Sequence, residues 1–279
     1  MKKGEKGIAI GFVFLFLVVG LISWIAWGNT ALQRSDVRIE KANLPAKFDG
    51  YTIAHISDLH NAEMGKDNEA LLSMLETAAP DMIALTGDLV DSRRTDLEVS
   101  IRFMERAVKI APCYYVTGNH EASLTKEYPT LEKELSKVGV RVLRNKEITI
   151  EKGGEFISII GLDDPNFSNL SPTDFIEEQL KDRDMSAFTV LLAHRPELFS
   201  TYVNYDIDLV LCGHAHGGQF RIFNQGIFAP GQGVFPKYTQ GVFTDGKTSM
   251  VVSRGIGNSA FPFRINNRPE VVIIQLSAV

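Results

Sequence analysis

The sequence feature that most constrains the fold is a short apolar run that ends in two side chains able to bind a metal ion. This run covers residues 53–60 and reads IAHISDLH. Its apolar positions predict a buried strand, and Asp58 and His60 follow at the carboxyl end. Residues two apart on an extended chain point to the same side, so a carboxylate and an imidazole can converge on one divalent cation. An isolated Asp-x-His pair is nevertheless common by chance.

Four later apolar runs end in the same way. Gly87-Asp88 follows residues 82–86, Gly118-Asn119-His120-Glu121 follows 113–117, His194 follows 187–193, and Gly213-His214-Ala215-His216 follows 207–212. Ligands of open α/β sheets bind beyond the carboxyl ends of the strands. Packing gives no reason for Asp, Asn and His to recur at five successive strand ends, so we expect these residues to meet in one site. His55 lies in the middle of the first run and is expected to be an ordinary core histidine.

The amino-terminal segment is the second constraint. Residues 8–27 are apolar apart from glycines and Ser23, and as a helix they would be about 30 Å long, the thickness of the hydrocarbon layer. Three lysines precede them, which places residues 1–7 in the cytoplasm and the rest of the chain outside. A cleaved signal peptide is the alternative, but the run is long and a good cleavage site is missing after Trp27. A buried core helix is the third alternative.

The remaining pattern predicts one folded domain. We expect a polar linker over residues 28–46 and a domain over 47–279. Helices are predicted at 69–79, 97–110, 128–138, 174–180 and 196–203, and strands at 53–57, 82–86, 113–117, 140–143, 147–150, 156–160, 187–193, 207–212, 250–253 and 271–276. Helices and strands alternate first and strands dominate later. This order predicts an α/β fold of two packed mixed sheets with flanking helices, a four-layer α/β/β/α sandwich preceded by one transmembrane helix.

Composition excludes some functions. The formal net charge is −5 and no long Lys/Arg run occurs, which argues against nucleic-acid binding. The two cysteines, Cys113 and Cys212, lie in or at the end of apolar runs. We expect both to be buried thiols rather than a disulfide or a nucleophile.

Taken together, the polar strand ends resemble the motif set of the calcineurin-like metallophosphoesterases. The residues that carry the resemblance are Asp58-x-His60, Gly87-Asp88, Gly118-Asn119-His120-Glu121, His194 and Gly213-His214-x-His216. Further stretches are similar to the membrane-associated bacterial branch of that superfamily: Gly161-Leu162-Asp163-Asp164-Pro165, Gly217-Gly218-Gln219, Tyr238, Gly241 and Pro262-Phe263-Arg264. The resemblance extends from about Tyr51 to the end of the chain.

The resemblance implies a pair of divalent metal ions. The first would be held by Asp58, His60, Asp88 and His216, and the second by Asp88, Asn119, His194 and His214, with Asp88 bridging. Mixed oxygen and imidazole ligands suit Mn, Fe, Zn or Co. Two such ions about 3.5–4 Å apart can hold a hydroxide that attacks phosphorus in line with the leaving oxygen.

By the same resemblance, His120 would protonate the leaving group, because it is the one motif histidine without a metal. Asp91 matches the family position that can orient this histidine, and a solvated loop carboxylate is the alternative. The chain has Ser92 where protein phosphatases of the superfamily have Arg. That difference argues against a phosphoprotein substrate. Arg93 and Arg94 come next, either as solvated surface or as contacts to a substrate phosphate.

Phenylalanines are concentrated after the last metal motif. Seven of the seventeen lie between Phe220 and Phe263. They either fill an irregular loop core or form an apolar wall that receives a lipid-linked phosphate ester from the membrane. Some relatives cleave the nucleotide diphosphate of a diacylated sugar, but a domain outside the membrane would not meet that cytoplasmic substrate.

Two functions are compatible with these features. The first is a phosphohydrolase on the outer face of the cell membrane, anchored by a single span, that cleaves a phosphodiester or a lipid-linked phosphate or pyrophosphate. The second is a non-catalytic, metal-stabilised protein that binds a cell-wall or lipid phosphate. His120 favours the enzyme, because a binding protein has no use for an unmetallated histidine beside two metal ions.

Overall fold

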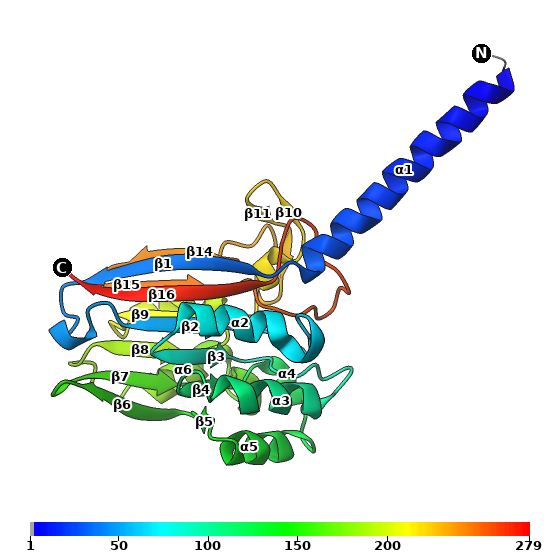
Figure 1. Cartoon of the computed structure of the whole chain (residues 1–279). Helices are drawn as coiled ribbons and strands as arrows, with labels where there is room; N and C mark the ends of the chain where they lie inside the picture. The colour runs from blue at the N-terminus through cyan, green and yellow to red at the C-terminus, as the bar shows by residue number, and fades with distance from the viewer. Residues whose placement is uncertain (1–2) are drawn as a thin grey trace.

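The computed structural model describes residues 3–279, and it shows two six-stranded sheets packed face to face with helices on their outer faces (Figure 1). In spatial order the first sheet consists of β1 (Gln33–Lys41), β16 (Glu270–Ala278), β2 (Thr52–Ile56), β3 (Met82–Thr86), β4 (Cys113–Val116) and β5 (Arg141–Val142). The second consists of β14 (Gly241–Asp245), β15 (Thr248–Val252), β9 (Leu209–Cys212), β8 (Thr189–Leu192), β7 (Glu155–Gly161) and β6 (Lys146–Lys152). The predicted four-layer α/β/β/α sandwich is confirmed.

The helices follow the order expected for such a sandwich. They are α1 (Lys3–Thr30), α2 (Glu69–Ala78), α3 (Leu97–Ala107), α4 (Asn119–Ser123), α5 (Tyr128–Lys137), α6 (Pro172–Leu180) and α7 (Phe199–Val203). Helices α2, α3 and α5 pack on the first sheet, and α6 and α7 pack on the second. The region predicted as one helix over 196–203 is a 3₁₀ turn, Pro196–Leu198, followed by α7.

Three apolar layers hold these elements together. The central layer lies between the sheets and includes Ile53, Ala84 and Leu211, all fully buried. The outer layers seal each sheet against its helices. Because the central strands are covered on both faces, they are apolar at nearly every position, as is usual for buried parallel strands.

Strand direction places the functional loops at one edge. Strands β2, β3, β4 and β5 are parallel to one another, and so are β7, β8, β9 and β15. The carboxyl ends of β2, β3, β4, β8 and β9 carry the polar motifs. Two small hairpins follow the last motif: β10 (Arg221–Ile222) with β11 (Gln225–Gly226), and β12 (Phe228–Ala229) with β13 (Gly233–Val234).

The predicted linker over residues 28–46 is wrong, because residues 33–41 form edge strand β1, paired in parallel with β16. Val37 and Ile39 face the core between the sheets, while the alternating charged residues Arg34, Asp36, Arg38 and Glu40 are exposed. This alternation is present in the sequence as a period of two. The high charge of the exposed face concealed it, although charge is what protects an edge strand from further pairing.

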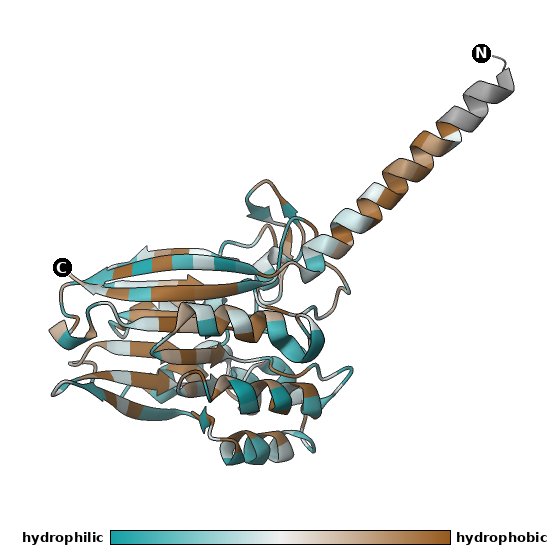
Figure 2. Ribbon diagram, in the orientation of Figure 1, coloured by the Kyte–Doolittle hydropathy of each residue, from teal (hydrophilic) through white to brown (hydrophobic). Residues whose placement is uncertain are grey.

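Helix α1 projects away from the domain (Figure 1), and it is apolar along most of its length (Figure 2). The window Ile10–Thr30 is long and apolar enough to cross a membrane, and none of it is buried against the rest of the chain. The helix extends beyond the predicted end at Trp27 to Thr30. It therefore meets the domain almost directly, with only residues 31–32 between it and β1.

Candidate metal centre

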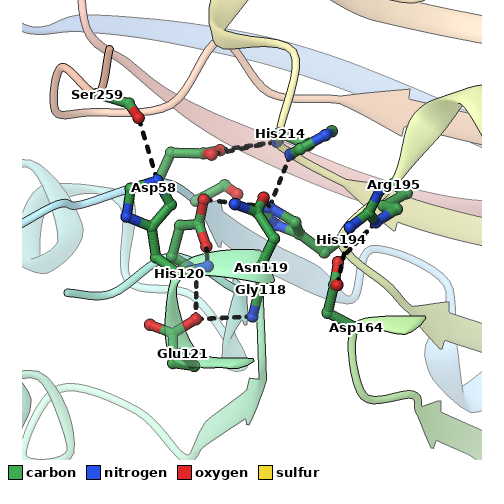
Figure 3. Close-up of polar contacts among 12 residues, drawn as sticks. Asp58, Gly118, Asn119, His120, Glu121, Asp164, His194, Arg195, His214 and Ser259 are labelled. Carbon is green, nitrogen blue, oxygen red and sulfur yellow. Dashed lines mark hydrogen bonds and ion pairs between the residues drawn. The ribbon is translucent and has the colours of Figure 1, made fainter. Parts of the chain in front are cut away.

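All seven residues predicted to bind metal meet at the edge of the sandwich where the parallel strands end. Figure 3 shows four of them, Asp58, Asn119, His194 and His214. Each of the six carboxylate and imidazole side chains among the seven is buried. These ligand atoms fall into two clusters that share Asp88, and within a cluster they lie within 4.8 Å of one another.

The first cluster contains Asp58, His60, Asp88 and His216. The Nε2 atoms of His60 and His216 are 3.2 Å apart. Asp88 Oδ2 lies 3.6 Å from Nε2 of His60, and Asp58 Oδ1 lies 3.4 Å from Nε2 of His216. Two imidazole nitrogens and two carboxylate oxygens thus point into one small space.

The second cluster contains Asp88, His194 and His214. Asp88 Oδ2 is 3.3 Å from Nε2 of His194, and Nδ1 of His214 is 3.1 Å from the same nitrogen. The side-chain oxygen of Asn119 adds a fourth atom, 3.2 Å from Nε2 of His194. The grouping equals the one that the family resemblance implied.

Backbone conformation is strained at the ligands. Five of them have positive φ angles between 46° and 64°: Asp58, His60, Asp88, His214 and His216. Non-glycine residues rarely adopt this left-handed region, and each such residue costs of order 1–3 kcal/mol. The surrounding fold maintains these turns, which aim the side chains at one another.

Close backbone approach also shapes the site. Gly87 has a φ of 88°, and a Cβ added to it would lie 2.6 Å from Nδ1 of His194. That nitrogen donates to the carbonyl oxygen of Thr86, 2.7 Å away, so Nε2 is the nitrogen of His194 that faces the second cluster. Hydrogen bonds fix the carboxylates as well: Asp88 Oδ1 accepts from the amide of His120 at 2.8 Å, and Asp58 Oδ2 accepts from that of His214 at 3.0 Å.

Charge in the site favours a cation. Burial lowers the pKa of His60 and His216 to about 3 and that of His214 well below its usual range, so these rings are neutral ligands. Burial alone would raise the pKa of Asp88, but the charge of His194 holds it well below the usual range. Conversely, burial would lower the pKa of His194, and Asp88 raises it to about 10. Asp88 therefore stays ionised at the point where the clusters meet.

Glu121 holds the loops that carry the metal ligands, a role that the sequence did not predict. Its Oε2 accepts hydrogen bonds from the amides of Asp88 at 2.9 Å and Gly118 at 2.7 Å, and its Oε1 accepts from that of Val90 at 3.2 Å (Figure 3). One buried carboxylate thus fixes the loops after β3 and β4. Its position directly after Asn119-His120 was visible in the sequence, but not its partners.

His120 lies beside the first cluster without joining it. Its ring centroid is 4.5 Å from that of His60. The amide of Ser92 donates to its Nδ1 at 2.9 Å, and Ser259 Oγ lies 3.1 Å from its Nε2. Asp91 Oδ1 is 3.6 Å from Nδ1, beyond hydrogen-bond distance, so the orienting role of Asp91 stays a prediction.

Arg93 approaches the same histidine through Ser259. Its guanidinium donates to Ser259 Oγ at 3.2 Å, and its side chain is exposed. Arg94 instead lies 3.8 Å from Asp91, with 71% of its side chain exposed. Of the two arginines, Arg93 is the one beside the candidate proton donor.

On the other side of the centre lies a buried ion pair. Arg195 donates to both oxygens of Asp164, at 2.8 and 2.9 Å (Figure 3). Glu197 lies 3.7 Å from Arg195 and 3.8 Å from Nε2 of His214. Arg195 and Glu197 come shortly after His194 in the chain, and Asp164 is paired with Arg195. Of these three residues, only Asp164 belongs to a motif identified in the sequence.

The donor set fits a pair of divalent ions. It offers the carboxylate oxygens and imidazole nitrogens of six buried side chains and the amide oxygen of half-buried Asn119, with one carboxylate shared between two groups. Such a mixture suits first-row transition metals, and a shared carboxylate is suited to a dinuclear centre. His55 takes no part: it is fully buried and its Nε2 lies 2.8 Å from Thr86 Oγ1, as expected for a core histidine.

Comparison with known proteins agrees with this geometry. Residues 51–218 match the family described as calcineurin-like phosphoesterase. The chain belongs to this family. It is therefore a metal-dependent phosphoesterase, and the centre described above is its candidate dinuclear site.

Relatives with similar sequences include membrane proteins. The metallophosphoesterase YkuE of Bacillus subtilis (strain 168) is 29% identical over 255 residues, which cover 88% of this chain and 86% of YkuE. Phosphodiesterase YaeI of Escherichia coli (strain K12) is 27% identical over 237 residues, covering 81% of this chain and 82% of YaeI. A transmembrane protein with metallophosphoesterase domain from Bos taurus is 26% identical over 98% of this chain and 63% of its own length.

Among solved structures, TT1561 of Thermus thermophilus superposes with a TM-score of 0.51 over 74% of this chain and 90% of its own. The two sequences are 16% identical. This similarity shows that the two proteins share a fold.

Proposed function

We propose that this protein is a membrane-anchored phosphohydrolase that cleaves a phosphodiester or a lipid-linked phosphate ester at a dinuclear metal centre. The observation that supports it most strongly is the meeting of seven ligand residues beside a histidine that neither cluster includes. A non-catalytic binding protein would need the clusters but not His120.

The ligand sets follow from the two clusters. Asp58, His60, Asp88 and His216 would hold one ion, and Asp88, Asn119, His194 and His214 the other. When bound, two divalent cations activate water for attack on phosphorus and neutralise charge on the phosphoryl oxygens. Comparing the rates of hydrolysis with Mn, Fe, Zn and Co would identify the metals that support activity.

The chain's own contribution to the reaction would come mainly from His120. Its Nδ1 accepts the amide hydrogen of Ser92, so in the neutral ring the proton is on Nε2, the nitrogen that faces Ser259. A leaving-group oxygen that replaces Ser259 Oγ would accept a hydrogen bond from this N–H. Proton transfer to that oxygen would require the ring protonated on both nitrogens, with the Nδ1 proton donated to Ser92 Oγ, 3.0 Å away. Arg93, on the other side of Ser259, could then bind a non-bridging phosphate oxygen.

The location of the enzyme follows from α1. We propose that residues 8–27 anchor the chain in the cell membrane, with residues 1–7 in the cytoplasm and the catalytic domain outside. The helix is unburied and apolar, and Trp24 and Trp27 lie near its end. The name of YaeI, a phosphodiesterase, supports a diester substrate for this chain.

The test is hydrolysis of an aryl phosphodiester by the purified full-length protein with each of several divalent metals. Asp88→Asn should lose both metal and activity, because it removes the charge shared by the clusters. His120→Ala should keep bound metal and lose turnover, and Arg94→Ala is the matched surface control. Absence of hydrolysis with every metal would contradict the enzyme and support the phosphate-binding alternative.

The lipid-linked substrate needs its own test. Turnover of lipid-linked and water-soluble phosphodiesters is compared for the wild type and for Phe228→Ser and Phe235→Ser. We expect both variants to lose activity on the lipid-linked ester only. Equal rates on both substrates, unchanged in the variants, would contradict this substrate class.

A further inference from the structure

We propose that the tip of the β10–β11 hairpin, which lies beside α1, and the apolar residues around the end of β13 contact the lipid bilayer at the level of the headgroups. The membrane-contact face consists of Ile222, Phe223, Val234, Phe235, Phe261 and Phe263. This proposal rests on the membrane anchor of the proposed function, but it requires no catalytic activity.

The first observation is exposure. Phe223 is 94% exposed, Phe235 67% and Val234 65%. Beyond α1, most of the large exposed apolar side chains among the described residues lie between residues 222 and 263. Phe261 and Phe263 both pack on Phe220, the residue before β10. Clusters of exposed apolar side chains mark interaction sites.

The second observation is backbone strain at two exposed phenylalanines, Phe223 in the β10–β11 turn and Phe235 directly after β13. Their φ angles are 52° and 54°. The left-handed conformation is unfavourable for a bulky side chain, whereas Gly or Asn adopts it readily. Because Phe223 is almost fully exposed, its side chain packs against almost nothing in the chain that would offset this cost. Contact with an apolar environment outside the chain would offset it.

The third observation is a hydrogen-bonded connection between the β10–β11 hairpin and α1. Asn29, in the last turn of α1, donates to the carbonyl of Arg264 at 3.0 Å and accepts from its amide at 2.7 Å. The carbonyl oxygen of Ile265 in turn accepts a hydrogen bond of 3.0 Å from the amide of Arg221, at the start of β10. The β10–β11 hairpin and α1 consequently rise from the same end of the domain (Figure 1).

The charge of this end of the domain suits an anionic bilayer as the partner. Residues 217–240 and 254–269 contain no acidic residue, although the whole chain has a net charge of −5. Of their basic residues, Lys237 is exposed and Arg268 half-buried, while Arg221, Arg254 and Arg264 are buried. Basic residues next to a membrane span attract acidic phospholipids.

A cavity at the junction is consistent with such headgroups. It has a volume of about 210 Å³ and lies between Trp24 and Trp27 of α1 and three arginines, with no acidic residue in its lining. Arg268 stacks on Trp27, with its guanidinium carbon 4.8 Å from the ring centroid. Aromatic rings and basic groups at the end of a span belong at the level of the lipid headgroups.

The experiment places an environment-sensitive nitrobenzoxadiazole label on single introduced cysteines of the full chain. Cys113 and Cys212 are buried and should not react, which labelling of the wild type checks. The test positions are Phe223→Cys and Phe235→Cys. Phe16→Cys on α1 reports the anchor, and Phe156→Cys, at the start of β7 and 53% exposed, is the aqueous control.

Labelled proteins are reconstituted into phosphatidylcholine vesicles that contain phosphatidylglycerol. We expect spin-labelled lipid headgroups to quench positions 223 and 235, with blue-shifted emission, and chain-labelled lipids to quench position 16. Iodide in the water should quench only position 156 strongly. If 223 and 235 behave like 156 while 16 is quenched by lipid, the membrane-contact face is wrong and the anchor stands. If position 16 also behaves like position 156, both the membrane-contact face and the membrane anchor are wrong. If lipid quenches positions 223 and 235 but not position 16, the anchor alone is contradicted.

Discussion

Oε1 of Glu197 lies 3.8 Å from Nε2 of His214, and each side chain has a buried polar atom without a hydrogen-bond partner: Glu197 Oε2 and His214 Nε2. Nδ1 of His214 faces the second cluster, so its proton would be on Nε2, toward Glu197. At 3.8 Å the two groups do not form a hydrogen bond in the structure. We expect the Glu197 carboxylate to accept a hydrogen bond from this N–H when metal is bound, which would fix the ring.

Glu197→Gln should therefore weaken metal binding in the second cluster by about 10- to 100-fold, because the amide is a poorer acceptor than the carboxylate. Metal affinity is measured by competition with a chromophoric chelator. Glu178→Gln, on the exposed face of α6, is the matched control and should leave affinity unchanged. Equal affinity in both variants would remove Glu197 from a role at the centre.

Gly87→Ala tests the close approach at His194. The substitution should abolish metal binding, because its Cβ would press on Nδ1 of His194. Gly139→Ala is the control: Gly139 also has a positive φ, 99°, but nothing lies within 4 Å of an added Cβ. It should lose about 1–2 kcal/mol of unfolding free energy from backbone strain alone and retain its metal. Metal content and urea denaturation of the two proteins distinguish crowding from strain.

Glu121→Gln should lower the free energy of unfolding by about 1–3 kcal/mol, because the amide cannot accept from all three backbone N–H groups that the carboxylate satisfies. Urea denaturation is measured with a chelator present, so that metal binding does not contribute. Glu127→Gln, on the exposed surface before α5, should be neutral. A neutral Glu121→Gln would mean that the loops hold their shape without it.

Arg93→Ala should raise KM for a phosphodiester roughly tenfold, the equivalent of about 1.4 kcal/mol of lost binding. Its guanidinium is linked to His120 through Ser259, so it lies where a substrate phosphate would bind. Arg94→Ala should leave KM unchanged. Similar values for the two variants would mean that both arginines are only solvated surface.

Removal of metal should lower the melting temperature as well as activity. The ligands are held in left-handed conformations and carry adjacent carboxylates, a combination that a bound cation stabilises and an empty centre does not. Thermal unfolding of chelated and metal-replete protein checks this expectation. Identical melting temperatures, with metal bound in one sample, would show that the fold maintains the strain unaided.

The sequence was sufficient for the ligands because their signal is local. Asp58 and His60 stand two apart at the end of an apolar run, and Gly87-Asp88 and Gly213-His214 repeat that layout. Each motif is weak alone, and their recurrence at successive strand ends is what identifies the ligands. A local signal was also present for β1, because Val37 and Ile39 alternate with charged residues. The high charge of that stretch nevertheless led to the wrong prediction of a linker over residues 28–46.

What lies around the ligands was decided by tertiary structure alone. Asp58 accepts a hydrogen bond from an amide 156 residues away, at His214, and His120 meets Ser259 at a separation of 139 residues. Such pairs depend on how the two sheets are packed, and no periodicity along the chain encodes that. The amino-acid sequence therefore determined which side chains can bind metal and that a long apolar helix precedes them. Sheet packing decided which carboxylates, hydroxyls and arginines stand behind them, because those contacts form only when distant strand ends meet at one edge.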